Sequence, residues 1–127
     1  MASLILDGAD LVVKMSELER VEAFHSDVRV ALVAVQAVRV VDDAWPELRG
    51  IRAPGTGIPG VIAVGTRRGP FGKDFAVVHG QERAVVVDLA GADYGRLVVT
   101  TPDAESVAAE IRRHLTSSFG EPLPPAD

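Results

Sequence analysis

The chain has no cysteine and few aromatic residues. The lack of cysteine excludes disulfides, thiolate zinc sites and thiol catalysis. Aromatic residues make up 5% of the 127 residues, so a core has to be built from Val, Leu, Ile and Ala. The longest apolar-rich run free of charge, Gly and Pro is Val30 to Val38, whereas a membrane-spanning helix needs about 20 residues. The first residues, MASLILDGAD, lack a basic leader, so we expect no signal peptide, no transmembrane segment and a cytoplasmic location.

Length and charge narrow the class of protein. A chain of this length predicts one domain, which we place at residues 1–118. Residues 119–127 include the Pro-rich run EPLPPAD, and we expect them to be a disordered tail. The net charge of −5 disfavours a general nucleic-acid binder, whose binding domain would be basic.

The sequence of the first third of the chain predicts a β-hairpin, a short helix and two more strands. Asp7-Gly8 suits a turn with positive φ inside a hairpin from Ser3 to Lys14. Ser16 and Glu19 form a capping-box pattern that starts a helix, in which Leu18, Val21 and Phe24 recur at helical spacing. The valine-rich stretch from Asp27 to Asp43 favours two strands joined near Ala34, with a helix from Ala31 to Val38 as the alternative.

The rest of the chain alternates short strands with glycine turns and ends in a helix. Ala44 to Arg49 reads as a helical turn and Ile51 to Gly60 as a Gly/Pro loop. The expected strands are Val61–Thr66, Phe75–Val78, Ala84–Leu89 and Arg96–Thr100. The final helix runs from Pro102 to Leu115, with Thr101 as its N-cap, Arg112, Arg113 and His114 in its last turn, and an apolar stripe of Ala104, Val107, Ala108, Ile111 and Leu115.

These elements predict a mainly β fold (α+β). Short antiparallel strands without long intervening helices make a curved sheet or barrel. We expect about seven strands in a bent antiparallel β-sandwich or partly open barrel, capped by the C-terminal amphipathic helix. Trp45 is expected to plug one end, because a core so poor in aromatics needs a large side chain there.

The segments DVRVALVAVQAVRVVDD and RLVVTTPDAESVAAEIRRHL, with the glycine-rich hairpins between them, resemble bacterial pleckstrin-homology-like domains. The resemblance covers residues 4 to 115 and implies two orthogonal sheets of seven strands capped by the C-terminal helix. It also implies binding of lipid, peptide or another copy, without chemistry. The chain departs from the family pattern at the early helix and at Ile51 to Gly60, and no ligand motif matches, so no binding residue is transferred.

The glycine-rich segment is also where the positive charge gathers. Eight of the twelve glycines lie between Gly50 and Gly80. Residues 49–83 carry a net charge of +4, and the rest of the chain carries −9. Arginine forks and exposed backbone N–H groups suit an anionic head group or an acidic partner. The candidate anion-binding residues are Arg49, Arg52, Arg67, Arg68 and Lys73. The alternative is a solvated hairpin tip whose charges balance an acidic surface.

Other motifs do not predict a catalytic or metal site. Gly55 to Gly60 matches G-x-G-x-x-G, but a nucleotide site needs a strand before the glycines and a helix after them. The three histidines lack metal-ligand spacing, and Asp42, Asp43 and Glu47 read as a turn. Thr116 to Ser118 lacks a nucleophile elbow. We therefore expect no catalytic residues, no metal and no cofactor.

The sequence thus favours a non-enzymatic binding or self-assembly module with a protein partner or a second copy of the chain. Unpaired edge strands of a small sandwich invite completion by another strand. Ala84 to Val87 is apolar on both faces and suits a central strand or a protected edge. The alternative is a flavin-type split barrel, an oxidoreductase or cofactor carrier in which Arg67, Arg68 and Lys73 would hold the phosphate.

Overall fold

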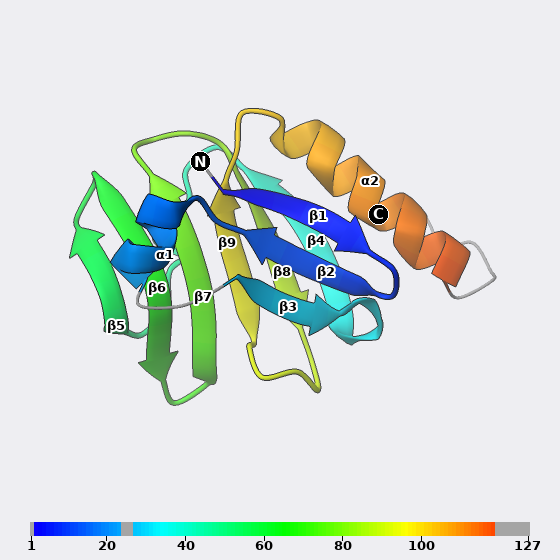
Figure 1. The fold of residues 1–127 in the computed structure, drawn as a ribbon, viewed down its shortest axis with the longest axis horizontal. Coiled ribbons are helices and arrows are strands. Elements are labelled where there is room, and N and C mark those ends of the chain that lie inside the picture. Colours follow the sequence, from blue (N-terminus) through cyan, green and yellow to red (C-terminus); the bar gives the residue numbers. More distant parts are fainter. Residues whose placement is uncertain (1, 24–26, 119–127) are drawn as a thin grey trace.

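Nine strands in two sheets and two α-helices form the part of the chain that the structure describes (Figure 1). The structure is a computed structural model; it describes residues 2–23 and 27–118, with the backbone alone for residues 52–54 and 116–118. The expected fold class, a mainly β sandwich with a C-terminal helix, is confirmed, and the sheets do not close into a barrel. The strand count is higher than the seven or so expected.

The small sheet is built from the N-terminal strands. It has the antiparallel order β1 (Ser3–Asp7), β2 (Asp10–Lys14) and β3 (Val28–Ala31). The predicted turn at Asp7-Gly8 joins β1 to β2, and Gly8 has the positive φ of +60° that such a turn requires. A 3-10 turn, Leu32–Ala34, then leads the chain into the other sheet at the predicted connector.

The large sheet has six strands. Its order is β4 (Val35–Val41), β8 (Ala84–Leu89), β9 (Arg96–Thr100), β7 (Gly72–His79), β6 (Ile62–Gly69) and β5 (Ile51–Ile58). Neighbours are antiparallel except β7 and β9, which are parallel. Strands β4 and β5 therefore form its two edges, and β8, predicted as a central or protected strand, is central.

Strand β5 corrects the prediction of a Gly/Pro loop at Ile51 to Gly60. The segment pairs with β6, although the register shifts between Arg52 and Gly55. Glycine and proline disfavour central strands, but an edge strand tolerates them because its outer N–H groups need no partner in the sheet. The G-x-G-x-x-G stretch thus belongs to a β-hairpin, with no helix opening on its glycines.

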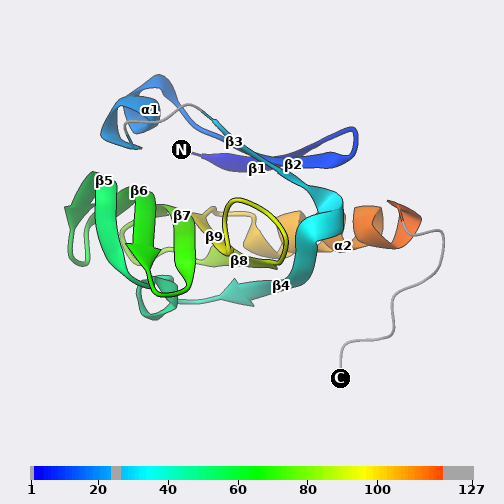
Figure 2. The same cartoon turned by 90° about the horizontal axis from the view of Figure 1, so that it is seen from below.

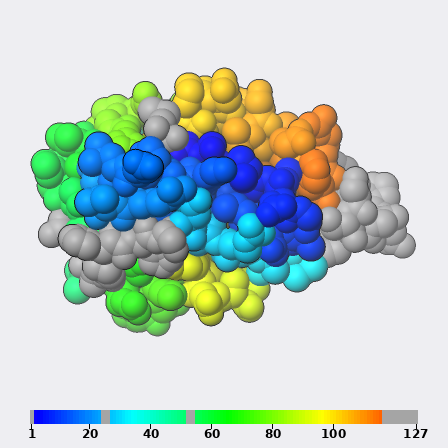
Figure 3. All heavy atoms as spheres, viewed as in Figure 1, coloured from blue at the N-terminus to red at the C-terminus, as the bar shows by residue number. Residues whose placement is uncertain are grey.

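The small sheet lies over one face of the large sheet, which we call the inner face (Figure 2). In the space-filling view, atoms of α1 and the small sheet cover much of the molecule between the β5–β6 ribbon and α2 (Figure 3). Helix α1 (Glu17–Ala23) packs on β5 and β6, and α2 (Ala104–Ser118) packs on β4 and β8. The main core fills this space, and its largest fully buried side chain is Phe75.

The opposite, outer face carries a second apolar cluster. Its buried residues are Ala44, Ala63, Ala76, Val78, Ala84, Val86 and Val98. Trp45, in the 3-10 turn Trp45–Glu47, packs on this cluster, and its indole Nε1–H donates to the Gly80 carbonyl at 2.9 Å. Trp45 is half-buried, and it covers a sheet face instead of plugging the end of a barrel.

Both helices differ in detail from their predictions. The capping box is confirmed: Glu19 N–H donates to Ser16 Oγ, and Ser16 N–H donates to Glu19 Oε1. The expected apolar face is reversed, because Leu18 and Val21 are each 68% exposed while Glu19 is buried. Phe24 lies outside the described residues.

Helix α2 begins two residues after the predicted start and continues past the predicted end. The Asp103 carbonyl accepts the first bond, from Val107 N–H, while Thr101 N–H donates to the carbonyl of Arg83, the residue before β8. Arg112 to His114 are therefore one turn before the end. The predicted apolar stripe does face the core: Ala104, Ala108, Ile111 and Leu115 are buried and Val107 is partly buried.

Candidate functional site

The structure separates the five predicted anion-binding residues. Arg67 is paired with Asp74 and Arg68 with Lys73 across β6 and β7. Because successive strand residues point to opposite faces, Arg67 lies on the outer face while Arg68 and Lys73 lie on the inner side. The side chain of Arg52 lies outside the described residues.

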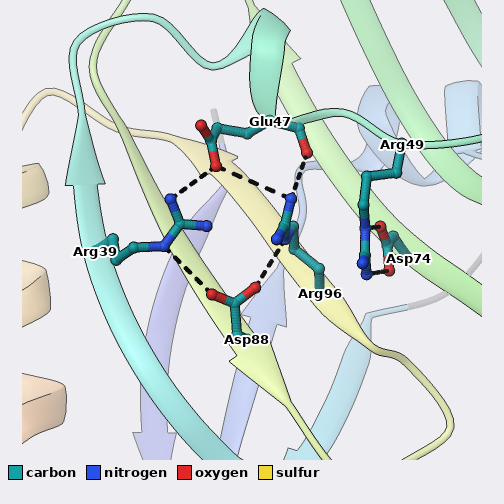
Figure 4. A network of polar contacts seen from close by, with 6 residues as sticks. All are labelled: Arg39, Glu47, Arg49, Asp74, Asp88 and Arg96. Atoms are coloured by element: carbon teal, nitrogen blue, oxygen red, sulfur yellow. Dashed lines mark hydrogen bonds and ion pairs between the residues drawn. The ribbon is translucent and has the colours of Figure 1, made fainter. Parts of the chain in front are cut away.

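Arg49 is fixed by an ion pair on the outer face (Figure 4). Its Nε and Nη2 donate to the two oxygens of Asp74 at 2.8 and 2.7 Å, and the guanidinium stacks 4.3 Å above the Phe71 ring. Asp74 is only 2% exposed, so this pair compensates a buried carboxylate. We therefore assign Arg49 a structural role.

Arg67 also bonds within the protein. Its Nε donates to the Arg49 carbonyl at 3.0 Å and its Nη2 to the Gly50 carbonyl at 2.9 Å. These bonds tie the chain entering β5 to β6. The flavin alternative relied on Arg67, Arg68 and Lys73 around one phosphate, and their division between two faces gives it no support.

Arg68 and Lys73 are the two candidates that lie together. They are directly opposite in the β6–β7 ladder, near the end of the hairpin. The Lys73 ammonium lies 4.6 Å from the centroid of the Tyr94 ring, a cation–π distance. Burial raises the pKa of Tyr94 above its ordinary value, although its hydrogen bond with Thr66 and the charge of Arg68 act against this rise.

A four-residue ion network covers the neighbouring part of the outer face (Figure 4). Arg39 binds Glu47 at 2.8 Å and Asp88 at 3.3 Å, and Arg96 binds the other oxygen of Asp88 at 2.8 Å. Arg96 also donates to the Glu47 carbonyl at 3.1 Å. Two cations balance two anions. Glu47, which lies in a turn as predicted, also ties this turn to β4 through Arg39 and to β9 through Arg96.

An apolar groove of about 490 Å³ lies along the β5–β6 ribbon, beside Trp45. Its lining is Trp45, Leu48, Gly50, Ile51, Gly57, Ile58, Pro59, Ile62, Ala63 and Arg67. Ile51 is 73% and Ile58 54% exposed, at the two ends of the edge strand. Predominantly apolar lining with few polar groups is typical of binding sites. The sequence prediction missed this groove because it treated β5 as a loop.

Exposed hydrophobic residues gather at the same end of the molecule. Of the seven large hydrophobic residues found exposed in the described chain, five lie on α1, β5 or the β5–β6 turn: Leu18, Val21, Ile51, Ile58 and Val61. These three segments are neighbours at the left end of Figure 1. Such clustering marks an interaction surface. We call it the β5 end.

A buried carboxylate on α1 links three parts of the fold. Glu19 Oε2 accepts from Ala2 N–H and lies 2.7 Å from His79 Nε2, on the inner side of β7. Burial raises the pKa of Glu19, but the bonds from Ser16 and His79 outweigh this effect, so its pKa lies below 4.5. Nearby, Glu22 Oε1 is buried without a hydrogen-bond partner among the described residues.

Comparison with known proteins identifies no relative: no family model, curated protein or solved structure matches the chain. The resemblance to pleckstrin-homology-like domains therefore stays a prediction. Within residues 2–23 and 27–118, no three acidic or histidine side chains are placed to bind a metal ion. In the same residues, no helix is long and apolar enough to cross a membrane.

Proposed function

We propose that the protein is a non-enzymatic binding and self-assembly module, and that the β5 end is its docking surface. The observation that carries the proposal is the concentration of exposed hydrophobic side chains around an open sheet edge and an apolar groove. Water-exposed isoleucines on an unpaired edge strand are normally avoided, because they invite pairing with another chain.

The geometry of β5 favours a second copy of the chain as the partner. Antiparallel pairing of β5 with β5 of another copy is two-fold symmetric, and in the register centred between residues 54 and 55, Ile51 of each copy meets Ile58 of the other. The contact between Ile51 and Ile58 therefore occurs twice in the dimer. The same surface serves both partners, as an isologous interface requires.

The middle of the strand limits how strong this association can be. Pro54 has no N–H to donate, and the register shift between Arg52 and Gly55 bends the strand there. Burying an isoleucine completely contributes about 1.5–3 kcal/mol, whereas association costs about 4–15 kcal/mol. Four partly exposed isoleucines therefore support at most a weak dimer, with a Kd no tighter than about the micromolar range.

Sedimentation velocity at micromolar to millimolar concentrations tests the proposal. We expect a concentration-dependent dimer for the wild type and a monomer for Ile51→Lys/Ile58→Lys. Val33→Lys is a matched control, because Val33 is 68% exposed in the turn between β3 and β4, away from the β5 end. Trp45 is the only tryptophan and lines the groove, so its emission should shift to the blue as the dimer forms.

A wild type that stays monomeric at millimolar concentration would refute self-assembly. A dimer that Ile51→Lys/Ile58→Lys leaves intact would show that association uses another surface.

A further inference from the structure

Two like charges stand directly opposite each other in the β6–β7 hairpin. Arg68 and Lys73 are register partners, which places their Cβ atoms about 4.5–5.5 Å apart on one face. Like charges at such a position repel and destabilise a hairpin. Within the described chain, neither cation forms an ion pair with a carboxylate, in contrast to Arg49, Arg39 and Arg96.

The hairpin that carries this pair is held from both sides. On its outer side the Phe71 ring packs under the Arg49 guanidinium and against Gly50 and Gly69. On its inner side Lys73 lies over Tyr94, whose ring packs edge-on against Phe75 with centroids 5.8 Å apart. The strands that carry the two cations are therefore held in place, and their register sets the two residues side by side on one face.

Tyr94, which lies beneath Lys73, adds a hydroxyl group near the two cations. Tyr94 is buried and its hydroxyl shares a hydrogen bond with Thr66. Its neighbour Asp93 is exposed and is the nearby carboxylate whose charge acts on Tyr94. The hairpin end projects beyond α1 and the small sheet in Figure 1, so a ligand can approach it.

We propose that Arg68 and Lys73 form a binding site for a phosphate-class oxyanion, such as a phosphomonoester. A doubly charged oxyanion removes the repulsion between the two cations. The arginine fork can bind two of its oxygens, and the lysine adds a point charge. The proposal rests on the proposed function as a binding module and names its ligand class.

Backbone amide NMR during titration with sodium phosphate, at ionic strength held constant with sodium chloride, tests the site. We expect saturable shifts at Arg68, Lys73 and Tyr94. In Arg68→Gln/Lys73→Gln the affinity should fall at least about tenfold, because each charge-assisted bond contributes more than a neutral one. Asp93→Asn should strengthen binding, since it removes a nearby negative charge.

Lys14→Gln/Arg113→Gln is the matched control, because it removes two exposed cations elsewhere and should keep the phosphate shifts. If the control lost as much phosphate affinity as Arg68→Gln/Lys73→Gln, binding would reflect general charge attraction, and the proposed site would be wrong. Absence of saturable shifts in the wild type would overturn it as well. Either result is independent of the sedimentation series, so this site and the self-assembly proposal fail separately.

Sedimentation with vesicles distinguishes two sources of the phosphate group, a lipid head group and a soluble phosphomonoester. Wild type and Arg68→Gln/Lys73→Gln are sedimented with phosphatidylcholine vesicles that contain or lack phosphatidic acid. Loss of the phosphatidic-acid-dependent fraction in the variant identifies a lipid phosphate, and phosphate shifts without vesicle binding identify a soluble phosphomonoester. Equal sedimentation of both proteins on phosphatidic acid, together with absent phosphate shifts, refutes both sources.

Discussion

At the scale of single residues, close backbone contacts decide how the basic hairpin is held. Gly50 has a φ of +72°, a conformation that residues with a Cβ rarely adopt. A Cβ there would also run into the Arg68 carbonyl and the Phe71 ring. Gly50 therefore allows the chain entering β5 to lie directly against the β6–β7 hairpin.

We predict that Gly50→Ala destabilises the fold by about 1–3 kcal/mol, through backbone strain and this collision. Gly60→Ala is the control, because Gly60 has a similar φ of +78° but open space around its Cα. Urea unfolding measures both variants. If Gly50→Ala lowered the free energy of unfolding no more than Gly60→Ala, the fold would not require the close approach of the chain at Gly50 to the β6–β7 hairpin.

At the scale of elements, the C-terminal helix completes the core at the β4 side of the large sheet. Ile111 is 1% exposed in the main core cluster, and α2 packs on β4 and β8. The apolar stripe of α2 that directs Ile111 into the core can be recognised in the sequence, because its residues recur at helical spacing.

Ile111→Ala should lower the free energy of unfolding by about 2–4 kcal/mol, since it leaves a cavity in the core. Glu105→Ala, on the exposed side of the same helix, should change it by no more than about 0.5 kcal/mol. Similar urea midpoints for the two variants would contradict the packing of α2 on the sheet.

At the scale of the whole molecule, Glu19 connects the N-terminal segment, α1 and the large sheet. Its carboxylate bonds to Ala2, Ser16 and His79. The pKa of Glu19 is lower in the folded protein than the ordinary 4.5. The folded state therefore gains stability from ionised Glu19 above about pH 4.5 and loses it as the pH falls through the folded pKa.

We predict that Glu19→Gln unfolds more easily at neutral pH, because Gln keeps the shape but loses the charge-assisted bonds. Its stability should also fall less steeply between about pH 5 and pH 3 than that of the wild type. Urea unfolding across this range, with Glu105→Gln as control, provides the measurement. If the stability of Glu19→Gln fell as steeply with decreasing pH as that of the wild type, other groups would be responsible for the acid sensitivity.

The sequence predicted elements that depend on neighbours along the chain. Asp7-Gly8, the Ser16–Glu19 capping box, the break between β3 and β4 and the stripe of α2 each involve residues within a few positions of one another. Local backbone preference and periodicity settle such features. They failed at β5, where Gly and Pro indicate a loop and only pairing with β6 makes a strand.

The candidate surfaces depend on contacts between distant residues, which no local pattern contains. The sequence determined that a basic, glycine-rich segment exists, because composition alone shows it. Tertiary structure decided which of its cations bond internally, as Arg49 does with Asp74, 25 positions away, and which stand together, as Arg68 and Lys73 do. It also turned Leu18 and Val21 outward, because the interior beside α1 is occupied by Glu19 and its hydrogen-bond partners, a long-range arrangement that helical spacing cannot reveal.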